Sequence, residues 1–372
     1  MVAARAFTNP CRLLAIAGLL LASAAATQGG KPAQKGTSPL EAKIRKEVES
    51  NRGLMEGDVE DLDADLGQRI GLAGARGFVL SMRAPGERAD LEASVVRSEM
   101  AFFEYAKDLG FADPAELWAD DLGPAEFYLF RTAAEYQLAR ERNGKGSWQN
   151  GRFLPLLRGD SKIHSQWWKQ QHYGQAAIWT RGMEEHQALH FLGKFAGIAL
   201  IERLPSVGGM APSREEKAKE GERRSMEKLD WILEGMSTYC ELRFLKSAQV
   251  HCISEVRSTA VGRSDDDKSH PEKLVPKIAS GERSAKTFQV LARLENSEMD
   301  AADAAKCWSL VDLLMRDAHR AKFVQCLRLR KELSWESSFG RAFGWTWENL
   351  ESEWRTAVGV KAPEKKGPPK KK

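Results

Sequence analysis

The sequence lacks a long apolar run beyond its first residues, and most of it lacks an excess of charge of either sign. Its 372 residues include 56 Lys and Arg and 52 Asp and Glu, a net charge of +4. Residues 361–372 hold six Lys and one Glu, so this end carries +5 and the remaining 360 residues sum to −1. This balance argues against binding to nucleic acid. We also expect no membrane span, because a spanning helix needs about 20 consecutive apolar residues.

Motifs of several common enzyme classes are also missing. The chain contains no phosphate-binding P-loop, no dinucleotide-binding glycine fingerprint and no serine nucleophile elbow. Tyrosine is scarce: there are five residues, and none of them follows Tyr239. Nucleotide-dependent chemistry and serine hydrolysis therefore have no support in the sequence.

The first 26 residues have the pattern of a secretory signal peptide. Arg5 and Arg12 provide a positively charged start, residues 13–22 are apolar, and residues 22–26 are small. We expect cleavage after Ala24 or Ala26 and export to the periplasm, the cell surface or the medium. The composition of residues 27–75 predicts a linker and a charged helical segment, and that of residues 359–372 a Lys- and Pro-rich disordered tail.

Export would permit disulfide bonds among the four cysteines of the mature chain, Cys240, Cys252, Cys307 and Cys326. Four cysteines allow three pairings, and free buried thiols are an equally acceptable interpretation. If residues 301–316 and 322–333 form a helical hairpin, Cys307 and Cys326 lie at similar heights along it. A bridge would then require Cα atoms about 4.4–6.8 Å apart.

Apolar spacing predicts an α+β fold with a small N-terminal sheet and a mostly helical C-terminal part. Strands are expected at 77–82, 127–130, 152–157 and 175–179, and a helix at 91–109 with Asp90 as its N-cap. Further helices are expected at 181–203, 225–246, 301–316, 322–333 and 347–357, with an exposed loop at 205–222. We expect one domain over residues 76–250 and a helical domain over residues 251–358.

Two histidines, His186 and His190, stand four residues apart in the helix expected at 181–203. Residues so spaced lie on one face of a helix, one turn apart, so the two imidazoles can bind one metal ion. Glu234 precedes a glycine in the helix expected at 225–246. Because two His, one Glu and an open position for water form a common catalytic zinc site, these three residues are predicted to bind zinc.

The pattern H-x-x-x-H followed by W-I-x-E-G-x-x-x-Y-x-E resembles the gluzincin zinc metallopeptidases, particularly secreted bacterial members. His186, His190 and Glu234 match the three zinc ligands of that family. The resemblance implies a zincin-like fold for the domain at residues 76–250, zinc as the cofactor and a peptide or protein as the partner.

The chain departs from the gluzincin pattern at Gln187, where the family has the Glu that acts as general base. An amide does not accept a proton near neutral pH, so Gln187 cannot take one from metal-bound water. At about 100° per residue, Glu184 and Glu185 point well away from the metal direction. The metal ligands are therefore present, while the catalytic base is substituted.

Three hypotheses follow. The first, which we favour, is a secreted gluzincin-like protein that binds zinc, has impaired or lost peptidase activity and acts by binding peptide or protein. The second is an active metallopeptidase whose general base comes from elsewhere in the fold. The third is a metal-free structural or interaction protein. The sequence does not define the oligomeric state.

Overall fold

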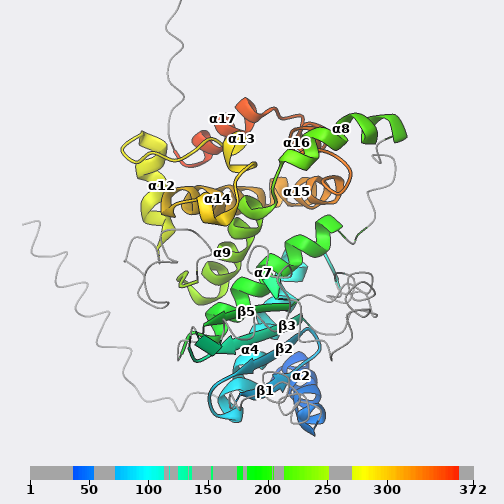
Figure 1. The fold of residues 1–372 in the computed structure, drawn as a ribbon, viewed down its shortest axis with the longest axis vertical. Helices are drawn as coiled ribbons and strands as arrows, with labels where there is room; N and C mark the ends of the chain where they lie inside the picture. The colour runs from blue at the N-terminus through cyan, green and yellow to red at the C-terminus, as the bar shows by residue number, and fades with distance from the viewer. Residues whose placement is uncertain are drawn as a thin grey trace, which may run out of the picture. The chain divides into compact units, whose positions relative to one another are not determined.

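A small sheet from the N-terminal half and a larger set of helices from the C-terminal half make up the fold (Figure 1). The computed structural model describes residues 37–53, 72–112, 117, 125–132, 134–135, 152–153, 174–178, 182–202, 204, 213–250 and 270–359. Outside these residues lie the predicted signal peptide, the tail from residue 360 and Cys252. The domain boundary expected between residues 250 and 251 falls where one of the described ranges ends. Residues Leu40–Lys372 belong to one compact unit.

The sheet has five strands in the order β1-β2-β3-β5-β4. These are β1 (Ala73–Arg76), β2 (Leu80–Ala84), β3 (Ala125–Phe130), β4 (Arg152–Phe153) and β5 (Gly174–Ile178). The three central strands β2, β3 and β5 are parallel, and the edge strands β1 and β4 run antiparallel to their neighbours. Helix α4 (Arg88–Asp108) lies between β2 and β3 in the chain and packs against β1 and β2. A parallel pair needs such a crossover, because its strands cannot be joined by a tight turn.

Helices dominate the described residues outside the sheet. They are α2 (Pro39–Ser50), α7 (Glu184–Glu202), α8 (Arg214–Met226), α9 (Asp230–Leu245), α12 (Pro271–Ser280), α13 (Phe288–Leu291), the 3-10 turn η3 (Asn296–Glu298), α14 (Ala301–Leu314), α15 (Asp317–Leu329), α16 (Trp335–Phe343) and α17 (Trp347–Ala357). The fold is thus mixed α+β and mostly helical, as predicted. None of the helices in the described ranges is both long and apolar enough to cross a membrane.

Glycines allow α9 to approach the helices on both of its sides. A Cβ added to Gly193 of α7 would lie 2.8 Å from the backbone oxygen of Met236, and one added to Gly197 would lie 2.9 Å from the Met236 sulfur. On the other side, a Cβ on Gly235 would lie 2.7 Å from the backbone oxygen of Cys307 in α14. These distances leave no room for a larger residue, so α7, α9 and α14 form the closely packed centre of the molecule.

Aromatic side chains join the start of α9 to the C-terminal helices. The Trp231 ring lies with its centroid 5.3 Å from that of Trp335, 6.0 Å from Phe288 and 6.3 Å from Trp347. At the other end of the core, Phe191 of α7 stacks on Phe127 of β3 at 5.3 Å. The apolar core therefore runs from the sheet through α7 and α9 to α17.

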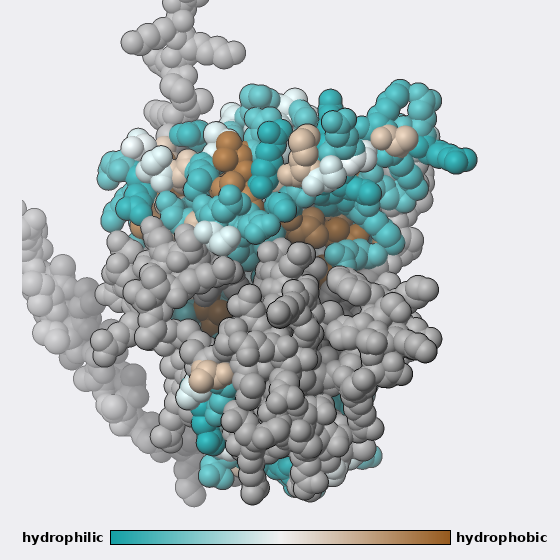
Figure 2. Space-filling model, in the orientation of Figure 1, coloured by the Kyte–Doolittle hydropathy of each residue, from teal (hydrophilic) through white to brown (hydrophobic). Residues whose placement is uncertain are grey.

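The surface over the C-terminal helices is mainly hydrophilic in the face that Figure 2 shows. Met226 and Val290 are the large hydrophobic side chains that stand exposed among the described residues. Single exposed apolar residues of this kind are normal for a folded protein.

Most predicted elements are confirmed. The strand expected at 77–82 begins only at Leu80, because residues 77–79 connect β1 to β2. Two further expectations are wrong. Helix α8 occupies most of the region expected to be a loop, and α4 has Glu87 rather than Asp90 as its N-cap. Of the two interpretations left open for the cysteines, free buried thiols are found at Cys240, Cys307 and Cys326. Helices α14 and α15 do follow each other as predicted.

Candidate functional site

The two histidines of the predicted metal motif share one carboxylate. Nδ1 of His186 lies 2.9 Å from Oε2 of Glu241, and Nδ1 of His190 lies 2.8 Å from Oε1 of the same residue. His186 and His190 are one turn apart on α7, and Glu241 faces them from α9. A single carboxylate therefore holds both imidazoles in place.

Glu241 is fully buried and accepts further hydrogen bonds from the backbone. The amide N–H groups of Gln249 and Val250 donate to its Oε2 at 2.9 and 3.3 Å. Burial raises the pKa of Glu241, but the hydrogen bonds from His186 and His190 outweigh burial, so the pKa lies below its ordinary value. An ionised carboxylate only accepts hydrogen bonds, so both histidines carry a hydrogen on Nδ1.

This arrangement fixes the chemistry of the opposite ring nitrogens. When Nδ1 of a neutral imidazole holds the hydrogen, Nε2 carries the lone pair that binds a metal. Nε2 of His190 lies 3.7 Å from Oε2 of Glu234, and both side chains are excluded from solvent, with exposed fractions of 1% and 0%. His186, at the start of α7, keeps 16% of its side-chain surface exposed.

The donor types and one spacing fit zinc. Two atoms bound to one tetrahedral zinc at about 2.1 Å lie about 3.4 Å apart, close to the separation of the His190 and Glu234 donors. Within the described ranges, however, no three His, Cys, Asp or Glu side chains already converge as a ligand set. The structure thus brings His190 and Glu234 together and ties His186 to them through Glu241.

The general-base position is occupied by a buried amide. Gln187 is 3% exposed and follows His186 on α7. Of the two flanking carboxylates, Glu185 forms an ion pair with Arg97 of α4. That carboxylate is therefore held toward the Arg97 guanidinium of α4.

Two other histidines of the described chain lie apart from this cluster. His270 pairs with Glu272 two residues away at 3.0 Å, and the ring of His319 packs against those of Trp345 and Phe343. Both side chains contact neighbouring residues away from the predicted metal motif. Their spacing in the sequence is not that of metal ligands. His164, His172 and His251 lie outside the described residues.

From the sequence alone, Glu241 had no predicted role in this site. It stands seven residues after Glu234, which is two helical turns and hence the same face of α9. That spacing could have marked it as a partner for the histidines. Comparison of the chain with known protein families gives no match, and comparison with curated proteins gives none.

Proposed function

We propose that this chain is an exported zincin-like protein in which His186, His190 and Glu234 hold zinc, and which binds peptide or protein segments with little or no cleavage. The observation that carries the proposal is the double hydrogen bond from the two histidines to Glu241. Metal-binding histidines are commonly oriented by a carboxylate on the other ring nitrogen.

Each residue has a distinct role in this proposal. Glu241 fixes the tautomer and the orientation of both imidazoles, and Glu234 supplies a negatively charged donor beside His190. Bound zinc would supply a Lewis acid that polarises a carbonyl group. Gln187 is an amide and cannot carry a proton from water to a leaving amine.

The metal content of the purified mature protein tests the zinc site. We expect about one zinc per chain, as for a three-ligand site, by mass spectrometry of the intact protein and by elemental analysis. His190→Ala should abolish binding, whereas His270→Ala, which alters an exposed histidine paired with Glu272, should not. A metal-free wild-type protein that also fails to take up added zinc would refute the proposal.

Peptide hydrolysis tests the loss of catalysis. Gln187→Glu should raise the rate on a broad peptide library, because general acid–base help is worth roughly 10²–10⁴-fold. An unchanged rate in a zinc-loaded variant would mean that the missing base is not what limits hydrolysis. Efficient, chelator-sensitive cleavage by the wild-type protein would favour the active peptidase instead.

A metal-free interaction protein is the second candidate. It is favoured by the absence of a converged three-residue ligand set among the described residues. The histidines and Glu241 would then form a purely structural hydrogen-bonded cluster. This function predicts that neither zinc nor a chelator changes the melting temperature, whereas a zinc-binding protein is stabilised by its ligand.

A further inference from the structure

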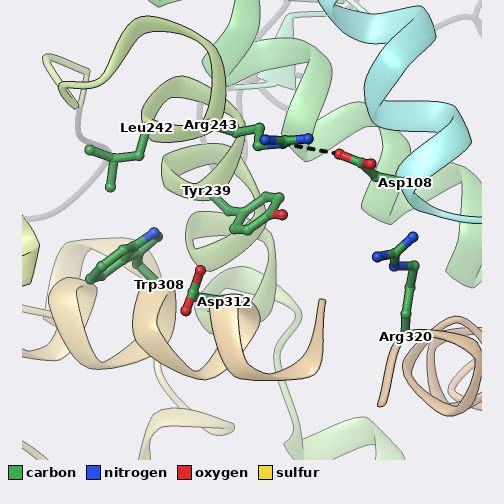
Figure 3. A pocket seen from close by; sticks show the side chains of 7 residues that line it. All are labelled: Asp108, Tyr239, Leu242, Arg243, Trp308, Asp312 and Arg320. Atoms are coloured by element: carbon green, nitrogen blue, oxygen red, sulfur yellow. Dashed lines mark hydrogen bonds and ion pairs between the residues drawn. The ribbon is translucent and has the colours of Figure 1, made fainter. Parts of the chain in front are cut away.

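A second candidate site lies away from the histidines, among α4, α9, α14 and α15. It is a pocket of 370 Å³, shown in Figure 3, and it is lined by Asp108, Tyr239, Leu242, Arg243, Trp308, Asp312 and Arg320. None of these residues belongs to the His186–Glu241 cluster. The volume is at the lower end of the range of small-molecule sites.

The pocket contains charges of both signs. Asp108 of α4 accepts from Nε of Arg243 at 3.2 Å, and Asp312 of α14 accepts from Arg316 at 3.2 Å. Arg320 of α15 donates Nε to a backbone oxygen and also pairs with Asp317. A carboxylate has about four acceptor sites and a guanidinium five N–H donors, so these bonds use only part of their capacity.

Two aromatic side chains with polar ends, Tyr239 and Trp308, also line the pocket. Tyr239 lies in the middle of the view, with Asp312 below it and Asp108 and Arg320 to its right. Neither the Tyr239 hydroxyl nor the Trp308 indole N–H makes a hydrogen bond to another residue of the described chain. Burial raises the pKa of Tyr239, and Asp108 adds to this effect, so the hydroxyl stays protonated and can donate.

We propose that this pocket binds a small zwitterion, an α-amino acid or a dipeptide with an aromatic or large apolar side chain. The ammonium group would be held by Asp312, and the carboxylate by Arg320. The apolar side chain would pack on Trp308 and Leu242. A ligand of one charge sign meets a like-charged pair in the same pocket, whereas a zwitterion finds a partner for each end.

This proposal does not depend on a metal and is tested separately from the zinc site. The mature protein is titrated calorimetrically with L-phenylalanine and with the dipeptide Gly-Phe, in buffer that contains a chelator. Phenethylamine, which lacks the carboxylate, and 3-phenylpropanoate, which lacks the ammonium, serve as matched ligands. We expect at least one zwitterion to bind, and both single-charge analogues to bind about tenfold more weakly or worse.

Charge-neutralising variants locate the binding. Asp312→Asn and Arg320→Gln should each weaken binding of the zwitterion about tenfold, an effect typical of a lost hydrogen-bonded charge. Glu215→Gln, a matched change at an exposed position of α8, should leave it unchanged.

The proposal is overturned if neither zwitterion binds, or if the analogues bind equally well. Binding that survives both pocket changes in folded protein would also overturn it. The ligand series on the wild-type protein decides the matter even if a variant fails to fold.

Discussion

Two places in the molecule enclose a carboxylate that has no access to solvent. One is the hairpin formed by strands β1 and β2, and the other is the contact between α7 and α9. Glu99 of α4 lies under the hairpin, where its Oε1 accepts from the backbone N–H groups of Val79 and Leu80 at 2.6 and 2.9 Å. Glu241 of α9 accepts from two imidazoles and two backbone N–H groups. The two residues are equally buried but differ in the kind of donor that bonds them, imidazole rings at Glu241 and backbone N–H groups alone at Glu99.

Their pKa values move in opposite directions. Burial raises the pKa of Glu99 from 4.5 to about 7, and the backbone hydrogen bonds only partly offset it. At Glu241 the same penalty of burial is outweighed by the histidines, and the pKa falls. Where only backbone N–H groups donate, as at Glu99, the pKa stays raised, whereas added imidazole donors lower the pKa of Glu241. An ionised carboxylate that accepts from the imidazole N–H is what orients metal-binding histidines, and the lowered pKa of Glu241 favours that form.

The largest expected effect comes from removing Glu241. Glu241→Ala leaves the buried imidazole N–H of His190, the partly buried one of His186 and two backbone N–H groups without their acceptor, and breaking a buried pair costs about 3–5 kcal/mol. Glu241→Gln keeps one acceptor oxygen and should cost less. Urea unfolding at neutral pH measures both. A loss below about 1 kcal/mol for Glu241→Ala would contradict the central role of this carboxylate.

Removing the charge of Glu99 should change the pH dependence of stability. Because its folded pKa lies above the unfolded 4.5, the folded state binds the proton more tightly, and stability is lost as pH rises from about 4.5 through 7. The loss amounts to about 3 kcal/mol for a shift of this size. Glu99→Gln should not show it. Since histidines titrate in the same window in both proteins, the difference between variant and wild type is the quantity to measure.

The pH comparison has a clear contradicting outcome. If wild type and Glu99→Gln lose stability in parallel between pH 5 and 8, the pKa of Glu99 is not raised in the folded protein. In that case the contrast with Glu241 would disappear.

Widening the contact between α7 and α9 should have a smaller but selective effect. A Cβ on Gly193 would lie 2.8 Å from the backbone oxygen of Met236, so Gly193→Ala forces a backbone shift that costs about 1–3 kcal/mol. The shift moves Glu241 relative to the histidines and leaves Glu99 where it is. We therefore expect the Glu99 component of the pH dependence to persist in this variant.

Gly221→Ala is the matched control. An added Cβ there meets nothing within 4 Å, and α8 has no fully buried residue. Alanine is favoured over glycine in a helix by about 1 kcal/mol, so this variant should be as stable as wild type or slightly more stable. Equal destabilisation by both changes would show that helix packing is not the cause.

The sequence predicts well those elements that are marked by apolar spacing. The helix around His186 and His190, the strand before Phe130 and the last helix are found where the pattern expects them. Helix α8 was not predicted because it buries no residue. Its sequence therefore lacks the repeating apolar positions that mark a helix packed on a core. Its start is fixed instead by a capping box between Ser213 and Glu216, and Glu216 also pairs with Arg341.

The site was predictable in part for a similar reason. Spacing along α7 and the glutamate before Gly235 identify His190 and Glu234, which do approach each other. Sequence spacing also places Glu241 on the face of Glu234, but it does not tell which residues of another helix that face meets. The register between α7 and α9 is set by Gly193 and Gly197, whose contacts arise only in the folded chain.

The glycine-lined packing of α9 also determines how its backbone amides exchange with solvent. Almost every residue from Asp230 to Glu241 is buried between α7 and α14, so no local opening can expose these amides without separating both neighbours. Their hydrogen–deuterium exchange should therefore proceed only through global unfolding, while the amides of exposed α8 exchange early. The slowest-exchanging amides of the protein would then report its total stability directly, from the same helix that carries Glu234 and Glu241.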